Sequence, residues 1–464
     1  MSLIKSISGI RGTIGGRINE NLTPIDTVKF AAAYGTWLTS VSSEDKKLKV
    51  VIGRDARISG SMISQLVSST LIGLGIDVID LGLSTTPTVE VMVTHLNADG
   101  GIILTASHNP KEWNALKLLN AKGEFISGAE GAKILEIAEN DDYIFAEVDE
   151  LGGYESNDEG MKIHIDKILA LPLVNIQAIK DRNFKVAIDA VNSTGGIAIP
   201  MLLDQLGVDY EKLYCDPTGH FPHNPEPLKE HLTDISNKVV EVNADFGIVV
   251  DPDVDRLALI SEDGEMFGEE YTLVAVADYV LSKTPSAAVS NLSSSRALRD
   301  ITSKYNQTYY ASAVGEVNVV DKMKEVGAKI GGEGNGGIIY PELHYGRDSL
   351  VGIALFLSHL AEMDRKVSEL RASYPSYFMG KKKIELTPEI NVDKLLSQIE
   401  EKYNEYDIST IDGVKIDFEN EWVHLRKSNT EPIIRIYTEA PTQEKADALG
   451  DRFISELNQI SQEN

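Results

Sequence analysis

The first third of the chain alternates apolar runs with amphipathic stretches, a pattern typical of strands followed by helices. Residues 49–53, 77–80 and 101–104 are apolar enough to be buried strands. One helix is predicted after Thr23, which suits an N-cap and is followed by proline, another over 62–74 before Gly75, and a third near 88–95. This alternation predicts parallel βαβ units with right-handed crossovers.

The same pattern begins again twice. Residues 184–189 predict a strand, followed by a helix from the Gly195-Gly196 pair to Leu206 and a second strand near Tyr210. Residues 246–250 start a further unit, whose helix covers 272–281. We therefore expect three related α/β domains.

The end of the chain has a different order of elements. A charged amphipathic helix at 395–403 is followed by a hairpin of strands at 413–418 and 422–426, a strand at 433–437 and a closing helix at 444–460. These elements predict a small C-terminal α+β domain. With a boundary expected in the acid- and glycine-rich segment 149–159, the predicted domains are 1–155, 156–255, 256–373 and 374–464.

Charge restricts what the chain can bind. Its 464 residues carry a formal net charge of −27, which argues against nucleic acid and anionic membranes as partners. An anionic small molecule would also be repelled, so its site must be locally basic, with cations within the screening distance of about 8 Å. The chain has no apolar run of about 18 residues and no signal-peptide pattern at its start. With one cysteine, Cys215, we expect a cytoplasmic location.

A serine follows the predicted strand 101–104. Thr105-Ala106-Ser107-His108-Asn109-Pro110 begins where a parallel sheet places ligand sites, and Asn109-Pro110 forces a turn just after Ser107. An ordinary polar turn fits these residues equally well. Because no G-x-S-x-G elbow is present, Ser107 and His108 do not make a hydrolase dyad by themselves.

Three aspartates follow the predicted strand 246–250. Asp251, Asp253 and Asp255 can converge on one hard cation, and Mg²⁺ prefers oxygen ligands of this kind. A calcium EF-hand loop begins with the same spacing, but Arg256 stands where that loop needs glycine, and 257–260 continue as a strand. A solvated acidic turn is also disfavoured, because apolar runs bracket the cluster.

A glycine-rich loop and a basic turn complete the candidate chemistry. Residues 331–337 contain five glycines around Glu333 and Asn335, which suit sugar hydroxyls, although a mobile linker is the alternative. Arg347 lies close by in the sequence. The basic turn contains Arg426, Ser428, Asn429 and Thr430, with Arg435 beyond, and offers a phosphate cradle where a strongly acidic chain needs one.

Taken in order, these four segments resemble the α-D-phosphohexomutase family over essentially the whole chain. T-A-S-H-N-P is highly specific for that family, and the loops D-x-D-x-D-R, G-E-x-[SN]-G and R-x-S-[GN]-T-E-P follow at the expected separations. Residues 9–12 resemble its N-terminal G-I-R-G motif, and Phe221-Pro222 resembles a second-domain signature. The resemblance implies four domains in a heart shape around a central cleft, with some rotation of the last domain.

The resemblance also implies roles. Ser107 would be the phosphoserine, and Ser107, Asp251, Asp253 and Asp255 would bind Mg²⁺. Lys117 would exchange the proton of the attacking hydroxyl, with its pKa lowered by neighbouring Arg11 and Arg256, and His108 would complete the catalytic group. Glu333, Asn335 and Arg347 would hold the sugar, whereas Arg426, Ser428, Asn429, Thr430 and Arg435 would hold the phosphate that is not transferred. A hexose 1,6-bisphosphate would be the intermediate and turn around during the reaction.

Three positions depart from the common family pattern. Pro252 and Ala115 each replace a glycine, and Gly337 stands where many members have histidine, a role that we expect Glu316 or His344 to take. The combination G-E-G-N-G-G with S-N-T resembles a branch that includes phosphoglucosamine mutases, so we expect glucosamine phosphate as substrate, with a phosphomannomutase/phosphoglucomutase as the alternative. The sequence does not distinguish a monomer from a homodimer.

Two other readings remain open. Val249-Val250-Asp251-Pro252-Asp253 resembles the nucleophile strand of haloacid-dehalogenase phosphatases, in which the first aspartate is phosphorylated. That reading leaves Ser107 and the Arg426 turn unexplained. A non-catalytic sugar-phosphate sensor would keep the site without turnover, which intact Ser107 and Lys117 argue against.

Overall fold

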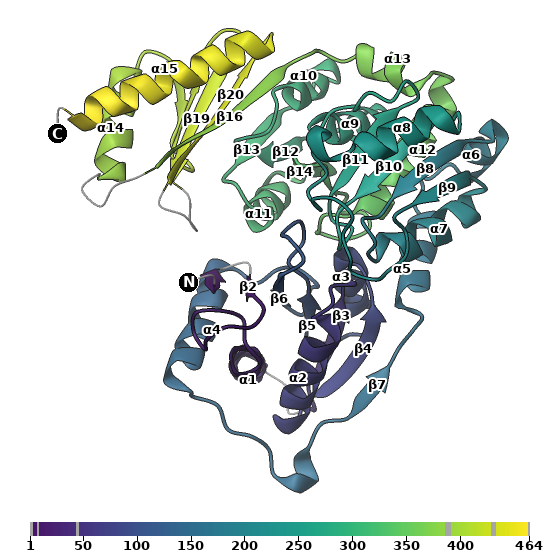
Figure 1. Ribbon diagram of the computed structural model, residues 1–464, viewed down its shortest axis with the longest axis vertical. Helices are drawn as coiled ribbons and strands as arrows, with labels where there is room; N and C mark the ends of the chain where they lie inside the picture. Colours follow the sequence, from purple (N-terminus) through teal and green to yellow (C-terminus); the bar gives the residue numbers. More distant parts are fainter. Residues whose placement is uncertain (1–2, 7–8, 43–45, 386–390, 428–432, 463–464) are drawn as a thin grey trace.

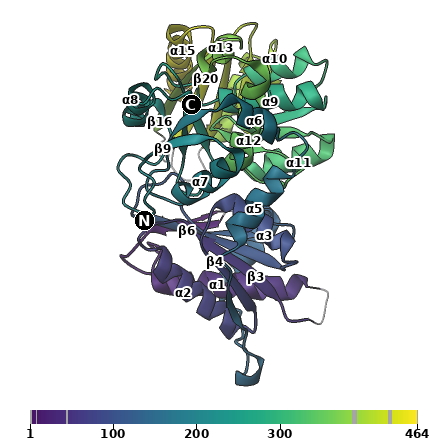
Figure 2. The same cartoon turned by 90° about the vertical axis from the view of Figure 1, so that its right-hand side faces the viewer.

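The structure is a computed structural model, and it describes residues 3–6, 9–42, 46–385, 391–427 and 433–462. Four sheets follow one another along the chain. In Figure 1 the first lies at the bottom, the second and third at the upper right, and the fourth at the upper left beside the third. Figure 2 shows the first domain below and the other domains above it. The expected three α/β domains and the C-terminal α+β domain are confirmed, and the sheets of the three α/β domains are mixed.

The first domain has a mixed seven-stranded sheet in the order β1-β2-β6-β5-β3-β4-β7. Its strands are β1 (Ile4–Ser6), β2 (Gly9–Thr13), β3 (Lys49–Arg54), β4 (Asp77–Leu83), β5 (Gly100–Leu104), β6 (Trp113–Leu119) and β7 (Tyr154–Ser156). Its helices are α1 (Pro24–Val41), α2 (Gly60–Gly73), α3 (Thr86–His95) and α4 (Gly128–Asn140), with a 3₁₀ turn η1 (Val148–Glu150). Thr23 caps α1, as the sequence predicts, and it also forms a capping box with Asp26.

The second domain has the strand order β11-β10-β8-β9. Its elements are α5 (Gly160–Leu169), α6 (Ile176–Arg182), β8 (Lys185–Asp189), α7 (Gly195–Leu206), β9 (Asp209–Leu213), η2 (Lys229–His231), α8 (Thr233–Glu241), β10 (Phe246–Val250) and β11 (Leu257–Ser261). Because β11 pairs antiparallel with β10, the division placed after residue 255 falls inside a hairpin, and the second sheet extends to Ser261. An apolar run after a short loop returns to its own sheet here instead of starting the next one.

The third domain has the strand order β13-β12-β14-β15. Its elements are α9 (Tyr271–Lys283), β12 (Ala288–Asn291), α10 (Ala297–Lys304), β13 (Tyr309–Ser312), α11 (Glu316–Val326), β14 (Ile330–Glu333), β15 (Gly337–Ile339), α12 (Ser349–Met363) and α13 (Val367–Ala372). One continuous apolar core joins the second and third domains, whereas the first and fourth have cores of their own.

The three α/β domains share one arrangement of four strands. Two parallel pairs are followed by an antiparallel hairpin in β4-β3-β5-β6, in β9-β8-β10-β11 and in β13-β12-β14-β15. The hairpins β5–β6, β10–β11 and β14–β15 are therefore equivalent positions. Their turns hold the serine loop, the aspartate loop and the glycine-rich loop, respectively.

The C-terminal domain is an antiparallel sheet in the order β16-β20-β19-β18-β17. Its elements are β16 (Phe378–Glu385), α14 (Val392–Lys402), β17 (Asp407–Ser409), β18 (Val414–Asp417), β19 (Trp422–Lys427), β20 (Ile433–Ala440) and α15 (Gln443–Gln462). Both helices pack on one face of the sheet, where they enclose a core that includes Leu425, Ile434 and Leu449. No helix in the described part of the chain is long and apolar enough to cross a membrane.

Candidate active site

The serine loop is held from behind by a buried arginine. Ser107 has a left-handed backbone (φ 48°), which a non-glycine residue keeps only when its surroundings impose it. Arg57 imposes it by donating to the carbonyls of Asn109 (2.7 Å), Pro110 (2.7 Å) and Trp113 (2.9 Å) and to that of Ser107 itself. Asp55 completes the support, because Oδ2 accepts from Arg57 Nε at 3.0 Å and from Thr105 Oγ1 at 2.7 Å.

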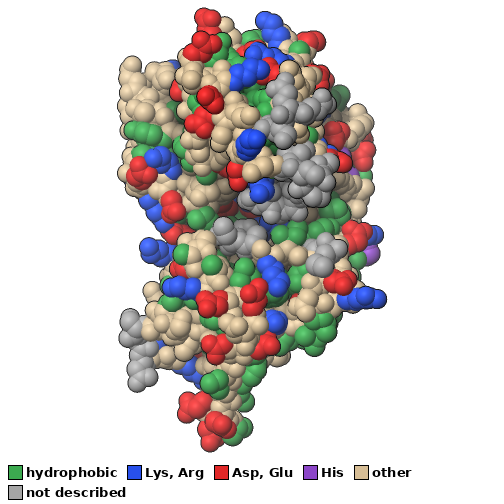
Figure 3. Space-filling view, turned by 90° about the vertical axis from the view of Figure 1, so that its left-hand side faces the viewer, with side chains coloured by type: hydrophobic (Ala, Val, Ile, Leu, Met, Phe, Trp, Pro, Cys, Tyr) green, Lys and Arg blue, Asp and Glu red, His purple; other side chains and the backbone are tan. Residues whose placement is uncertain are grey.

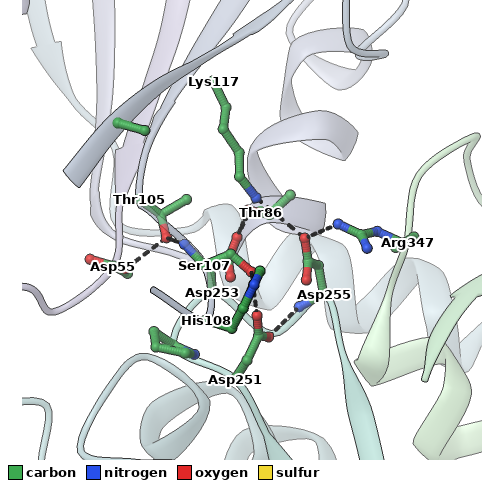
Figure 4. A network of polar contacts seen from close by, with 12 residues as sticks. Asp55, Thr86, Thr105, Ser107, His108, Lys117, Asp251, Asp253, Asp255 and Arg347 are labelled. Carbon is green, nitrogen blue, oxygen red and sulfur yellow. Dashed lines mark hydrogen bonds and ion pairs between the residues drawn. The ribbon is translucent and has the colours of Figure 1, made fainter. Parts of the chain in front are cut away.

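Ser107 faces the aspartate loop of the second domain (Figure 4). Its Oγ donates to Asp251 Oδ2 at 2.6 Å, which joins the turns of two equivalent hairpins. Asp251 Oδ1 accepts from the backbone N–H groups of Asp255 and Arg256, each at 3.1 Å. The structure therefore brings Ser107 close to the aspartate cluster. All three aspartate carboxylates are fully buried.

Cations from two other domains surround the aspartates. Lys117 Nζ, from β6, lies 2.7 Å from Asp253 Oδ2 and 3.3 Å from Asp255 Oδ2. Arg347 Nη2, from the loop before α12, lies 2.7 Å from Asp255 Oδ2. Thr86, the first residue of α3, donates its hydroxyl to Asp253 Oδ2. We call Ser107, Lys117, Arg347 and the three aspartates the transfer centre.

The expectation that Arg11 and Arg256 lower the pKa of Lys117 is wrong. Burial by itself lowers this pKa, but the adjacent Asp253 and Asp255 carboxylates raise it more, so the amine is held in its protonated form. Asp255 shows the reverse effect. Burial alone raises its pKa, whereas Arg347, Lys117 and Arg256 together hold it below its ordinary value.

The aspartates fit a hard divalent cation. Asp253 Oδ1 and Asp255 Oδ1 are buried and have no hydrogen-bond partner among the described residues. One ligand atom from each of the three aspartates lies within 4.8 Å of the others. Burial and the carboxylates of Asp253 and Asp255 hold the pKa of Asp251 well above its usual range. Oxygen donors that converge in this way suit Mg²⁺.

Arg11, His108 and Arg256 lie around this centre. Arg11, on β2, is paired in register with Ala115, and burial and Arg256 lower its pKa. His108 Nδ1 is 3.4 Å from Ser107 Oγ, and burial followed by the charge of Arg256 holds the pKa of His108 well below its usual range, so the imidazole is neutral. Arg256 is paired with Glu226 at 3.2 Å.

The glycine-rich loop places Glu333 against Arg347. Glu333 Oε2 is 2.8 Å from Arg347 Nη1, and its Oε1 accepts from Asn291 and from the backbone of Gly315. Asn335 is held by its own loop, since Oδ1 accepts from Gly337 N at 3.2 Å. Gly336 needs to be glycine, because its φ is 83° and a Cβ would lie 2.1 Å from the carbonyl oxygen of Leu257.

The two candidates for the histidine missing at Gly337 are engaged elsewhere. Glu316 Oε2 lies 2.9 Å from Arg347 Nε. His344 lies between Glu90 and Asp348, at 3.2 and 3.3 Å. The structure therefore uses both residues to hold the loop that carries Arg347.

Three cations form a row across the C-terminal sheet. In register, Lys383 of β16 is opposite Arg435 of β20, which is opposite Arg426 of β19. Their neighbours Ile384, Ile434 and Leu425 face the helices, so the row lies on the other face. Like charges placed opposite each other are destabilising unless an anion joins them. We call these three residues the cation row. Ser428, Asn429 and Thr430 lie outside the described residues.

The surface around the C-terminal domain carries charges of both signs. Figure 3 shows one side of the molecule, with the first domain at the bottom and the C-terminal domain at the top, and lysine and arginine side chains are mixed there with acidic ones. Arg426 Nε itself lies 3.3 Å from Asp412 Oδ2. A bound phosphate would therefore compete with a carboxylate for this guanidinium.

Some residues of the site were missed by sequence reasoning. Asp55, Arg57, Thr86 and Glu90 carry none of the loop motifs, yet each contacts or supports the transfer centre. Asp55 and Arg57 could have been found from the run Arg54-Asp55-Ala56-Arg57, because it places charges at the carboxyl end of the buried strand β3.

A strained serine against a buried acidic cluster, on a fold of three equivalent α/β modules, is the arrangement of a phosphohexomutase. The chain belongs to the phosphoglucomutase/phosphomannomutase family. It matches that family's alpha/beta/alpha domain I over residues 4–144, domain II over 162–264, domain III over 268–377 and C-terminal domain over 381–456. Phosphohexomutases are isomerases that transfer a phosphoryl group within one molecule.

Two relatives and one solved structure are similar to this chain over nearly its full length and nearly their own. A phosphoglucomutase/phosphomannomutase of Thermococcus kodakarensis is 37% identical over 441 residues, covering 94% of this chain and 95% of its own. A phosphoglucosamine/phosphogalactosamine mutase of Sulfurisphaera tokodaii is 32% identical over 470 residues, covering 99% of each chain. The crystal structure of a phosphoglucomutase/phosphomannomutase family protein from Burkholderia thailandensis matches with a TM-score of 0.85 at 25% identity, covering 98% of each chain.

Proposed function

We propose that the chain is a Mg²⁺-dependent phosphoglucosamine mutase that works through a phosphorylated Ser107. The observation that carries this proposal is the hydrogen bond of 2.6 Å between Ser107 Oγ and Asp251 inside the buried aspartate cluster. The Sulfurisphaera tokodaii relative, named a phosphoglucosamine/phosphogalactosamine mutase, supports the choice of sugar. The Thermococcus kodakarensis relative supports the alternative, a phosphomannomutase/phosphoglucomutase.

In the proposed reaction a hydroxyl of the hexose phosphate attacks the phosphorus of phospho-Ser107. The bond to Ser107 Oγ breaks, a bond to the sugar oxygen forms, and the hydroxyl proton passes to the chain. The resulting hexose 1,6-bisphosphate turns around and returns its other phosphoryl group to Ser107. Arg57 keeps the backbone of Ser107 fixed during both transfers, so that attack from either end of the sugar meets the same geometry.

Asp251, Asp253 and Asp255, together with an oxygen of phospho-Ser107, would hold the Mg²⁺. The bound cation would offset the charge of the carboxylates and of the phosphoserine, about −1.5 to −2, and make phosphorus more electrophilic. Asp253 Oδ1 and Asp255 Oδ1 are the free oxygens available for it among the described residues.

Lys117 is the proposed acid–base group. In the structure its amine is shared by Asp253 and Asp255 and is protonated, so it is arranged to give a proton to the departing Ser107 oxygen. To accept the proton of the attacking hydroxyl it must first lose its own. His108, which is neutral and 3.4 Å from Ser107 Oγ, is the second group that could take this proton.

The remaining residues bind the sugar phosphate. Glu333 and Asn335 would contact the ring hydroxyls, and Arg426 and Arg435 the phosphate that is not being transferred, together with Ser428, Asn429 and Thr430. The cation row supports this assignment, because it places three basic side chains next to one another on one face of the sheet. Cys215 is buried and free, which suits the reducing cytoplasm where we place the enzyme.

The test is an assay of the full chain with Mg²⁺ and a catalytic amount of glucose 1,6-bisphosphate. The 6-phosphates of glucosamine, mannose, glucose and N-acetylglucosamine are compared by kcat/KM, with Ser107→Ala as the control. We expect glucosamine 6-phosphate to be converted with the highest kcat/KM, and Ser107→Ala to be inactive. A preference for mannose or glucose 6-phosphate would establish the alternative, and no turnover of any sugar would refute the proposal.

A further inference from the structure

A buried polar chain links the first domain to the loop that carries Arg347. Glu90, on α3, is only 1% exposed, and its Oε2 lies 3.2 Å from Nδ1 of His344. The other ring nitrogen of His344, Nε2, lies 3.3 Å from Asp348 Oδ2, which also accepts from His164 Nε2 at 2.9 Å. His344 thus bridges a carboxylate of the first domain and a carboxylate next to Arg347.

The loop is fitted to Glu90 at close range. A Cβ on Gly346 would lie 1.8 Å from Glu90 Oε2, so the backbone beside Arg347 touches this carboxylate. Asp348 Oδ1 caps α12 by accepting from the backbone of Leu350 at 2.8 Å. His164 is itself fixed by Thr88 of α3, since its Nδ1 lies 3.0 Å from Thr88 Oγ1. Both ends of the loop around Arg347 are therefore tied to α3.

The same helix holds the other side of the aspartate cluster. Thr86, the first residue of α3, donates its hydroxyl to Asp253 Oδ2, and its N–H donates to the Asp253 carbonyl at 2.9 Å. Four residues later, Glu90 holds His344 and so the loop from which Arg347 reaches Asp255. The contacts close a ring from Asp253 through α3 and the loop back to Asp255.

We propose that Glu90 is a positioning residue for phosphoryl transfer, which acts through His344 to fix Arg347 on Asp255. This inference rests on the proposed function. If an amide replaced the carboxylate of Glu90, its contact with His344 would be lost, and Arg347 would no longer hold Asp255 in the orientation that leaves Oδ1 open to a cation. Substrate contacts on the C-terminal sheet would not change. The loss would therefore appear in kcat and in Mg²⁺ binding, not in KM.

The chain offers a matched control. Glu124, in the first domain, is paired at 2.6 Å with Lys324 of α11, so it also joins the first and third domains. Its partner Lys324 also lies over the ring of Tyr345, at 4.8 Å, but no hydrogen bond or ion pair among the described residues joins Lys324 to His344, Arg347 or Asp348. Glu90→Gln and Glu124→Gln each replace one carboxylate by an amide between the same two domains, and only the first removes a contact of His344.

The experiment compares both variants and His344→Gln with the wild type in kcat, KM and Mg²⁺ affinity measured by calorimetry. We expect Glu90→Gln to lower kcat about 10–100-fold and weaken Mg²⁺ binding about 3–10-fold, with KM within about threefold. Glu124→Gln should stay within about twofold in all three. Because Glu90 and His344 act through one contact, the variant that combines Glu90→Gln with His344→Gln should have a kcat no lower than that of the worse single variant.

Several outcomes would overturn the inference. If the wild type is active and Glu90→Gln loses only thermal stability, the tie is merely structural. Multiplicative effects in the double variant would mean that the two residues act separately. If Glu90→Gln does not fold, His344→Gln carries the same test. If the wild type bound zinc and His164→Gln abolished that binding, His164, His344 and Asp348 would be a metal site instead. An inactive wild type would refute the proposed function, whereas calorimetry with Mg²⁺ would still test the tie.

Discussion

The transfer centre and the cation row are built in opposite ways. In the transfer centre all three carboxylates are fully buried, and each is held by groups from another domain. In the cation row, the Lys383 side chain is 59% exposed, and Arg426 has a carboxylate 3.3 Å away that a phosphate can replace. The transfer centre joins the first three domains, whereas the cation row lies on a domain with its own core.

This difference matches the two tasks of a mutase. Phosphoryl transfer is fastest when the reacting atoms and charges are fixed in advance. Binding must instead accept a sugar phosphate in two orientations, because each end of the bisphosphate has to reach Ser107. A row of cations on a separate domain can follow the ligand, while the buried centre remains in place.

The largest expected effect comes from removing the hydroxyl in the transfer centre. Ser107→Ala should lower kcat by at least about 10⁴-fold, because no group remains to carry the phosphoryl. Affinity for the sugar phosphate, measured by calorimetry, should stay within about threefold of the wild type. If affinity fell as far as activity, the centre and the binding end would not be separate.

Removing the support behind the serine should cost stability. Arg57→Ala leaves Asp55 as an unpaired buried charge and four carbonyl groups without their donor, so we expect a loss of about 3–5 kcal/mol in the free energy of unfolding of the first domain. Chemical denaturation followed by fluorescence measures it. Arg54→Ala is the control, since Arg54 donates to one carbonyl at 3.3 Å and should lose about 1 kcal/mol or less. Equal losses would show that the serine loop does not depend on Arg57.

The cation row should respond differently. Arg426→Ala should raise KM about 10–100-fold with a smaller change in kcat, because a charge-assisted bond to phosphate is lost in ground and transition states alike. Lys382→Ala is the matched control, since Lys382 lies one residue from the row and pairs with Asp451 of α15 on the opposite face. A kcat effect larger than the KM effect for Arg426→Ala would place this residue in the transfer centre.

The smallest expected effect concerns pH. Burial lowers the pKa of His344, but its contacts with Asp348 and Glu90 raise it more, to about 10. A histidine whose pKa is raised by folding contributes stability below its unfolded pKa of about 6.5 and loses it as pH rises through the folded value. The melting temperature of the wild type should therefore exceed that of His344→Gln at pH 6.

The difference in the free energy of unfolding between the wild type and His344→Gln should become about 1–3 kcal/mol smaller from pH 6 to pH 10. Because Tyr, Lys and Cys residues titrate in both proteins, the difference between the two is the informative quantity. A gap of constant size between pH 6 and pH 10 would show that His344 is neutral in the folded chain.

Much of the fold and the site could be predicted from local sequence. Apolar runs and helix caps locate most elements, and the serine loop and the aspartate loop are recognisable because their polar residues directly follow a buried strand. Periodicity cannot say which sheet a strand joins, so the sequence predicts that Leu257–Ser261 belong to the third domain, whereas they pair with β10 of the second.

What could not be predicted depends on distant segments that meet in space. Arg57 lies about 50 residues before the carbonyls that it holds, and Glu90 lies far from His344 in the chain. The pKa of Lys117 was predicted in the wrong direction for the same reason. The sequence indicated arginines near it, whereas packing brought Asp253 and Asp255 closer.

The most direct test is to find which residue carries the phosphoryl group. The wild type is incubated with glucose 1,6-bisphosphate and Mg²⁺, and the digested chain is analysed by mass spectrometry after acid and after hydroxylamine treatment. We expect one phosphate on the peptide that contains Ser107, stable to both reagents and absent from Ser107→Ala. A phosphate on Asp251 that hydroxylamine removes would contradict the assignment and make the chain an aspartyl-phosphate enzyme.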